Sequence, residues 1–170
     1  MRRAAFFLVL AALAAPVGAA ADNGPGGDIP DNQVFLTFRD RSAGYTVKYP
    51  EGWARRGAGG LVTFSDKDNS IRIAVARGAM PTVAAVRSQL HGARITSQPK
   101  RLTLPVGSAL KVTFERRSAP NPVTGKGVTL MIDRYYLPGH GRVAVLDLGT
   151  PVGVDNVDAY RLISRSFRWR

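Results

Sequence analysis

The chain has 170 residues, no cysteine and a formal net charge of +12. The lack of cysteine excludes disulfides, thiol nucleophiles and thiolate metal ligands, so packing must stabilise the fold. The excess of basic residues would attract anionic surfaces, among them lipid headgroups, cell-wall polymers, acidic proteins and nucleic acid.

Residues 1–21 are predicted to form a cleaved secretory signal peptide. Met1-Arg2-Arg3 is positively charged, residues 4–15 are apolar and uncharged, and small residues lead up to Ala21. The apolar run is shorter than the roughly 20 residues that span a bilayer, which disfavours the alternative of a retained membrane anchor. No cysteine lies near the cleavage site, so a lipid-anchored lipoprotein is excluded. We expect export to a periplasm, the cell envelope or the medium, with no transmembrane segment in the mature chain.

Residues 22–33 are predicted to form a flexible leader before a single domain over residues 34–170. The leader is rich in glycine, proline, aspartate and asparagine and offers little to bury. Residues 34–38 and 45–49 are predicted strands, the second because large apolar and polar residues alternate in it. Trp53 follows, and we expect its large side chain to close one end of the core.

The middle of the chain changes from strand to helix. Residues 61–65 and 70–77 are predicted to form an antiparallel hairpin with a polar turn. Residues 81–92 follow a helical period, with a proline near the start and a glycine that can close the helix. A short amphipathic helix is therefore expected here.

The second half returns to strands and ends in a helix. Residues 95–104 and 109–116 are predicted strands, and residues 128–137 and 142–148 form the clearest hairpin of the chain. A C-terminal helix follows, for which Asp155 is the expected cap.

The whole pattern predicts the α+β class, with a central, mainly antiparallel sheet flanked by two helices. We expect the alternation from Tyr45 to Leu148 to build one twisted sheet whose apolar face the helices cover. In the adjacent pair Tyr135 and Tyr136, one side chain should point into the core.

Few residues suggest chemistry. His91 lies near the end of the first predicted helix and His140 lies in a Pro-Gly-His-Gly turn, and neither has a second ligand at metal-binding spacing. No G-x-S-x-G motif marks a serine nucleophile. Asp147 lies in an apolar strand and Arg134 in its hairpin neighbour, so a structural ion pair is expected if they meet. The sequence predicts no catalytic residue, metal or cofactor.

The segment Gly44–Trp53, GYTVKYPEGW, resembles the opening motif of the PsbP-like proteins and their Mog-type relatives. In that motif a glycine and an aromatic residue begin a strand that is followed by Pro-x-x-Trp. The order of the later elements is also similar, through the Tyr135-Tyr136 hairpin to a final helix that ends in Ser166-Phe167. The similarity spans residues 38–169.

This resemblance implies an α-β-α sandwich around an antiparallel sheet. It also implies an accessory role, because family members are mostly non-enzymatic; some dock on the lumenal side of photosystem II and support its manganese–calcium site. We place none of the family's metal-linked histidines on His91 or His140.

We therefore predict an exported, non-enzymatic, PsbP-like accessory or binding module that acts by protein–protein or anionic-surface contacts. Its partner would be a protein or an anionic envelope component; nucleic acid is not expected, because aromatic residues are not interleaved with the basic ones. Two alternatives stay open: a small-ligand carrier with a cavity near Trp53, and a hydrolase or metal-dependent enzyme whose pocket holds His140 or Asp147. The expected contact surface consists of five basic residues: Arg55, Arg56, Arg116, Arg117 and Lys126.

Overall fold

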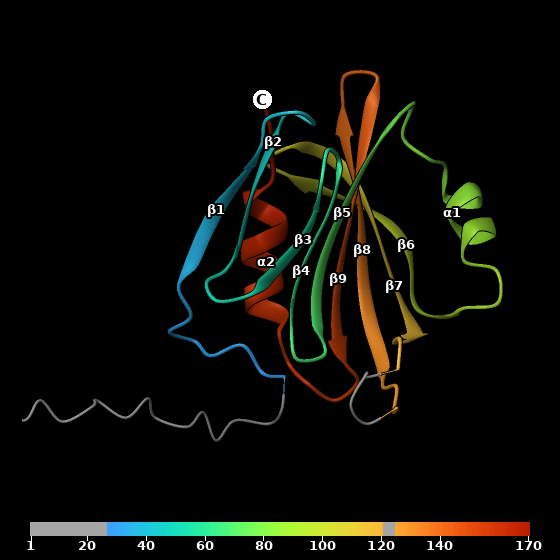
Figure 1. Ribbon diagram of the computed structural model, residues 1–170. Coiled ribbons are helices and arrows are strands. Elements are labelled where there is room, and N and C mark those ends of the chain that lie inside the picture. The colour runs from blue at the N-terminus through green and yellow to red at the C-terminus, as the bar shows by residue number, and fades with distance from the viewer. Residues whose placement is uncertain (1–26, 121–124) are drawn as a thin grey trace, which may run out of the picture.

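The computed structural model describes residues 27–120 and 125–170 and divides the strands between two antiparallel sheets (Figure 1). The smaller sheet consists of β1 (Phe35–Asp40), β2 (Tyr45–Pro50) and β10 (Arg168–Trp169). The larger sheet consists, in spatial order, of β3 (Ala54–Ala58), β4 (Leu61–Asp66), β5 (Asn69–Arg77), β9 (Arg142–Pro151), β8 (Thr129–Gly139), β7 (Gly107–Arg117) and β6 (Arg94–Leu104). The predicted signal peptide lies outside the described residues and stays a prediction.

The two helices cover opposite faces of the larger sheet. α1 (Val83–Gln89) packs Val86 into an apolar cluster with side chains of β7 and β8, such as Val112. α2 (Val157–Ser166) packs Ile163 into a second cluster, together with side chains of β4, β5 and the small sheet. Figure 1 shows α1 outside β6 and α2 between the small sheet and the larger one. The predicted α+β class is confirmed. None of the helices in the described ranges is long and apolar enough to cross a membrane.

Burial along each strand follows from which faces are covered. Phe64 of β4 is fully buried beneath the small sheet, whereas its neighbours in the strand are partly exposed. β9 crosses the region where both faces are covered, so residues 146–148 are all buried. Tyr135 and Tyr136 are both buried for the same reason, one in each apolar cluster. The expectation that only one of them points into the core was wrong.

The expected single sheet was also wrong, because among the described strands β2 pairs with β1 and β10 and not with the larger sheet. After β2 the chain turns at Gly52, whose φ of +87° favours glycine, and Trp53 is buried in the core before the larger sheet begins. The sequence pattern did not predict β3, the first strand of that sheet. All five of its residues are exposed, so no apolar alternation marks it, and its pairing with β4 makes it a strand.

A buried network of amides ties the end of the predicted leader to the domain. The Ile29 N–H donates to Asn156 Oδ1 over 2.8 Å, and the Gly27 carbonyl accepts from the side-chain amides of Asn69 and Asn156. The Asn156 amide also lies 2.8 Å from the Thr150 hydroxyl oxygen. Ile29 itself is buried. The described part of the leader, which begins at Gly27, is therefore held against the start of α2.

This network shifts the cap of α2 by one residue. Asn156, and not the predicted Asp155, occupies the N-cap position, and its side chain makes no capping hydrogen bond because the network uses it. Asp155 supplies the missing acceptor, since its Oδ1 accepts from the Val157 N–H over 3.1 Å. Asn156 therefore occupies the cap position, while Asp155 accepts the hydrogen bond from the helix start.

Candidate binding surfaces

The structure separates the five basic residues expected to form one contact surface. Arg55 and Arg56 lie on β3, at one edge of the larger sheet, and they point to opposite faces because adjacent strand residues alternate. Arg116 and Arg117 end β7, Lys126 precedes β8, and all three are exposed. β7 lies five strand positions from β3, or about 24 Å at the usual spacing of strands. The five residues therefore form two separate groups.

Arg134 and Asp147 face each other on β8 and β9 and form a two-point ion pair. The Nε–Oδ1 distance is 2.6 Å and the Nη2–Oδ2 distance is 2.8 Å. The Asp147 side chain is 4% exposed, and Arg72 of β5 approaches it to 3.9 Å. Hydrogen bonding to Asp147 raises the pKa of Arg134, against the opposing effect of burial. Together with Arg72, the pair links the neighbouring strands β5, β9 and β8, which is a structural role.

The two histidines lie apart on the surface. His91 follows α1 and His140 sits in the turn between β8 and β9, and both are exposed. Within residues 27–120 and 125–170, no group of three or more histidine, aspartate or glutamate side chains is placed to hold a metal ion.

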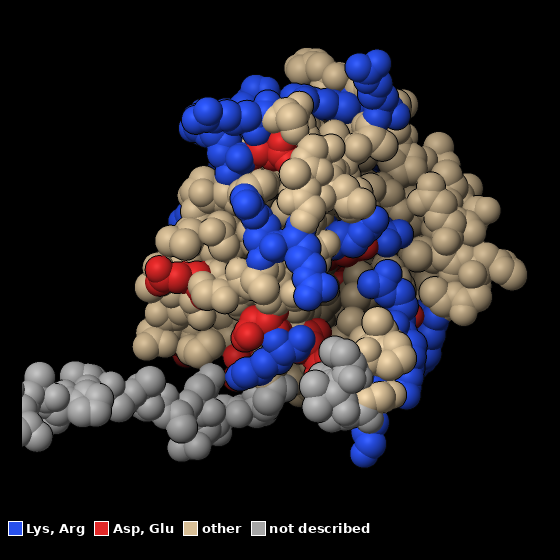
Figure 2. Space-filling view, in the orientation of Figure 1, with Lys and Arg blue, Asp and Glu red and all other residues tan. Residues whose placement is uncertain are grey.

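Positive charge gathers instead at one end of the molecule, where the β1–β2 turn, the end of β5, the start of β9 and the last strand meet. Figure 2 shows blue side chains massed across the top of the molecule with little red among them. We call this region the arginine end, and it consists of six arginines: Arg39, Arg41, Arg77, Arg142, Arg168 and Arg170.

Arg142 joins the segments of the arginine end. Its Nη1 donates to the Ala43 carbonyl over 2.7 Å, and its guanidinium carbon lies 4.1 Å from the Trp169 ring centroid. Arg77 lies directly opposite it in the β5–β9 ladder. The backbone N–H of Arg170 donates to the β1–β2 turn over 2.8 Å. Arg142 is half-buried, whereas the other five arginines are exposed.

The one carboxylate side chain in these segments is Asp40, and its oxygens are occupied. It is buried, and it accepts hydrogen bonds from the Ser42 hydroxyl and the Ala43 N–H, each over 2.8 Å, and from the Gly60 N–H over 3.4 Å. Burial alone would raise the pKa of Asp40, but these hydrogen bonds outweigh it and hold the pKa below its ordinary value. Asp40 is therefore committed to the turn, and the exposed guanidinium groups have no carboxylate side chain of this region to pair with.

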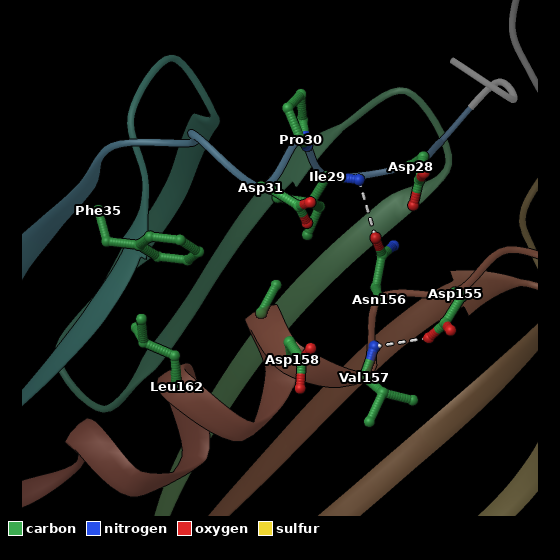
Figure 3. A pocket seen from close by; sticks show the side chains of 11 residues that line it. Asp28, Ile29, Pro30, Asp31, Phe35, Asp155, Asn156, Val157, Asp158 and Leu162 are labelled. Atoms are coloured by element: carbon green, nitrogen blue, oxygen red, sulfur yellow. Dashed lines mark hydrogen bonds between the residues drawn. The ribbon is translucent and has the colours of Figure 1, made fainter.

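At the other end of β9, residues 28–31 and the start of α2 enclose a pocket of about 640 Å³ (Figure 3). Apolar side chains form part of its wall, including Ile29, Phe35 and Leu162. Figure 3 shows two carboxylates on the incoming chain and two at the helix start. We call this site the acidic pocket, and its carboxylates are Asp28, Asp31, Asp155 and Asp158.

These four carboxylates differ in their partners. Asp155 caps α2 through Val157, and Asp158 lies 2.8 Å from Arg161 in an ion pair whose side chains are exposed. Neither Asp28 nor Asp31 has an ion pair or a side-chain hydrogen bond with any residue that the structure describes.

Three solved structures share this arrangement of sheets and helices. Cyanobacterial PsbP (CyanoP) from Synechocystis sp. PCC 6803 superposes with a TM-score of 0.55 and 14% identity, covering 92% of this chain and 100% of that one. The Ran-binding protein Mog1p of Saccharomyces cerevisiae gives a TM-score of 0.54 and 11% identity, covering 81% and 96% of the two chains. A protein of Bacteroides thetaiotaomicron VPI-5482 gives 0.53 and 12%, covering 79% of this chain and 48% of its own.

The chain has the Mog1/PsbP-like fold. The resemblance seen in the sequence is thereby confirmed at the level of the fold, which is all that identities this low can show. No protein-family model matches the chain, and neither does any curated protein.

Within this Mog1/PsbP-like fold, a second cavity of about 350 Å³ lies between the start of α2 and strands β6 to β9. Lys111 Nζ lies 2.7 Å from Asp133 Oδ2, and the Thr113 hydroxyl donates to Asp133 over 2.7 Å. Burial lowers the pKa of Lys111, but the hydrogen bond and charge of Asp133 outweigh it and raise the pKa overall. The Lys111, Thr113 and Asp133 side chains that line this cavity therefore already pair with one another.

Neither of the two cavities matches the alternatives that the sequence left open. Trp53, which was expected beside a ligand cavity, is packed in the apolar core and lines neither of them. His140 and Asp147, the candidates for a dispersed catalytic site, also line neither.

Sequence reasoning missed both the arginine end and the acidic pocket. In an antiparallel Mog1/PsbP-like sheet, alternate turns come to the same end of the molecule. Arg41 lies in the turn after β1 and Arg77 ends β5, whereas Asp66 and Asp68 flank the turn after β4, at the other end. The signal for the arginine end was the recurrence of single arginines at alternate turns, which no local motif displays. Charge does not simply alternate, because the connection from β7 to β8, at the other end of the sheet, carries Arg116, Arg117 and Lys126.

Proposed function

We propose that the protein is an exported, non-enzymatic binding module that docks through its arginine end on an anionic partner in the cell envelope. The observation that supports this most is that six arginines gather at one end of the molecule. The one carboxylate side chain in these segments, that of Asp40, is buried and hydrogen-bonded, so it is committed to the turn. The Mog1/PsbP-like fold is compatible with such a role, since Mog1p is itself described as a Ran-binding protein. Export rests on the predicted signal peptide.

The chemistry of the arginine end suits phosphate or carboxylate groups. A guanidinium group presents its N–H donors in a planar fork that matches both anions, and it stays charged at any physiological pH. Five of the six side chains are exposed and so can reach a partner. Because exposed charges are screened over about 8 Å at physiological ionic strength, this binding should weaken as salt rises.

The experiment compares binding of the purified protein to vesicles of phosphatidylcholine with and without phosphatidylglycerol, and to soluble polyglutamate, over a range of salt concentrations. The triple variant R41E/R77E/R170E reverses three exposed arginines of the arginine end. We expect its affinity for the anionic probe to fall about tenfold or more, because both attraction and steering depend on these charges.

The matched control is R116E/R117E/K126E, which reverses the same number of charges at the end of β7 and just before β8. We expect the control to change affinity by about twofold or less at physiological salt, because of screening. An equal loss in both variants would mean that net charge alone drives binding. A loss confined to the control would return the contact surface to the residues that the sequence first indicated. The vesicle and polyglutamate arms separate a lipid from an acidic protein.

A further inference from the structure

Two exposed apolar side chains line the acidic pocket. Six large hydrophobic residues are exposed in the described part of the chain. Val157 and Leu162, 60% and 38% exposed, line the pocket itself. Leu36 is adjacent to Phe35 in β1 and therefore points to the opposite face, and neither Val34 nor Val152 lines the pocket. Leu61 is the sixth and lies elsewhere, on β4. Exposed apolar side chains on the wall of a hollow in a highly charged protein are a feature of interaction sites.

The charge of the pocket is opposite to that of the molecule. The chain carries a net charge of +12, yet the pocket gathers four carboxylates beside its apolar wall. Helix stability accounts for Asp155 and Asp158, because negative charge is favoured at a helix start. It does not account for Asp28 and Asp31, which lie on the incoming chain and have no charged partner among the described residues.

We propose that the acidic pocket docks a segment of a partner protein that carries both basic and apolar side chains. A lysine or arginine can lay its aliphatic stem along Ile29, Phe35 and Leu162 while its charged head reaches a carboxylate of the rim. Neighbouring apolar residues of the segment would cover Val157 and the exposed side chains near it. This site goes beyond the proposed function, because it lies at the opposite end of β9 from the arginine end.

The net charge of the protein makes the test sharp. A protein with this large excess of basic residues repels a cationic peptide at long range, so binding requires a local acidic site. The probe is a fluorescent peptide of alternating lysine and leucine, and its binding to the purified protein is measured by anisotropy. Two control peptides replace lysine by glutamate or leucine by serine. We expect the lysine–leucine peptide to bind and both controls to bind at least about fivefold more weakly.

The variants separate the pocket from the charge around it. D31N/D158N removes two carboxylates of the rim, and D66N/D68N removes two exposed carboxylates of the β4–β5 turn, which do not line the pocket. We expect the first to weaken peptide binding about fivefold and the second by less than about twofold. Leu162→Ser should also weaken binding. Because Leu162 is only 38% exposed, the urea midpoint of this variant is measured beside its affinity, so that lost contact is separated from lost stability.

Three results would overturn this proposal. Equal weakening by the two double variants would show a diffuse charge effect, and undiminished binding of the lysine–serine peptide would show that the apolar wall plays no part. The third is self-association in sedimentation velocity that D31N/D158N disperses without any peptide binding, which would make a second copy of this chain the occupant. The variant R41E/R77E/R170E should bind the peptide normally, so failure here and failure of the proposed function remain distinguishable.

Discussion

The arginine end and the acidic pocket lie at opposite ends of β9, which runs from Arg142 to Pro151, a length of about 30 Å. Both are assembled from segments far apart in the sequence, but they are held together differently. One arginine side chain and backbone hydrogen bonds join the segments of the arginine end. A buried network of side-chain amides joins those of the acidic pocket. The comparison shows that the net charge of +12 does not predict the charge of any one surface, because the fold places basic and acidic side chains in different regions.

The largest expected fall in the free energy of unfolding is at the acidic pocket, where Asn156→Ala removes the central side chain of the amide network. The Ile29 N–H would lose its hydrogen-bond partner while buried, and the Gly27 carbonyl and the Thr150 hydroxyl would each lose one bond and keep one with Asn69. We expect the free energy of unfolding to fall by about 3 kcal/mol. Urea denaturation measures the loss, and hydrogen exchange of the Ile29 amide reports release of the incoming chain.

This variant also tests whether the two ends are independent. Peptide binding at the acidic pocket should be lost, whereas binding of anionic vesicles at the arginine end should persist under conditions where the protein stays folded. Asn156→Asp keeps the acceptor for Ile29 but sets a buried carboxylate oxygen against the Gly27 carbonyl and Asn69 Oδ1, so it should destabilise at least as much as Asn156→Ala. A loss under about 1 kcal/mol for Asn156→Ala would show that the network contributes little.

A smaller effect is expected from Arg142→Ala at the arginine end. The change removes the hydrogen bond to the Ala43 carbonyl and the stacking on Trp169, and we expect a loss of about 2 kcal/mol in the free energy of unfolding. Arg142→Lys is the control, because it keeps the charge but not the planar fork. If denaturation midpoints showed the lysine variant to be as stable as the unchanged protein, charge and not geometry would hold this end together.

The smallest changes in stability are expected for two buried tyrosines. Tyr160 lies beside the pocket and Tyr45 lies beside the β1–β2 turn. Burial raises the pKa of both hydroxyls, Asp40 adding to the effect at Tyr45. The Tyr160 hydroxyl donates to the Gly149 carbonyl over 2.6 Å, so Tyr160→Phe should cost about 1 kcal/mol.

The Tyr45 hydroxyl is buried without a hydrogen-bond partner in the described part of the chain. Tyr45→Phe should therefore leave stability unchanged or raise it by up to about 1 kcal/mol, because it removes an unsatisfied polar group. Thermal and urea unfolding of the two phenylalanine variants measure the difference, and an equal loss in both would contradict this account.

Much of the fold could be predicted because its cause is local. Alternation of apolar and polar residues identifies β2, β4, β5 and β7, and a change of period identifies α1. β3 could not be found this way, because Ala54–Ala58 is exposed throughout and becomes a strand only by pairing with β4. The division into two sheets was missed for a similar reason, since alternation does not say which strand is the neighbour.

The candidate sites were harder to predict than the fold. Adjacent pairs such as Arg55-Arg56 and Arg116-Arg117 drew attention because they are conspicuous in the sequence. In a strand, however, adjacent residues point to opposite faces, so such a pair seldom forms a patch. Single arginines at alternate turns do form one, because antiparallel strands bring those turns together.

The position of the arginine end also affects how the molecule would arrive at a target. The six arginines lie about 30 Å from the carboxylates of the acidic pocket and contribute an electric dipole along β9, which Arg116, Arg117 and Lys126 at the pocket's end of the sheet partly offset. In the field of an anionic surface such a dipole experiences a torque that rotates the arginine end forward before any contact forms. The orientational search would then be shortened at low salt and lengthened at high salt, so the association rate should depend on salt more steeply than the dissociation rate.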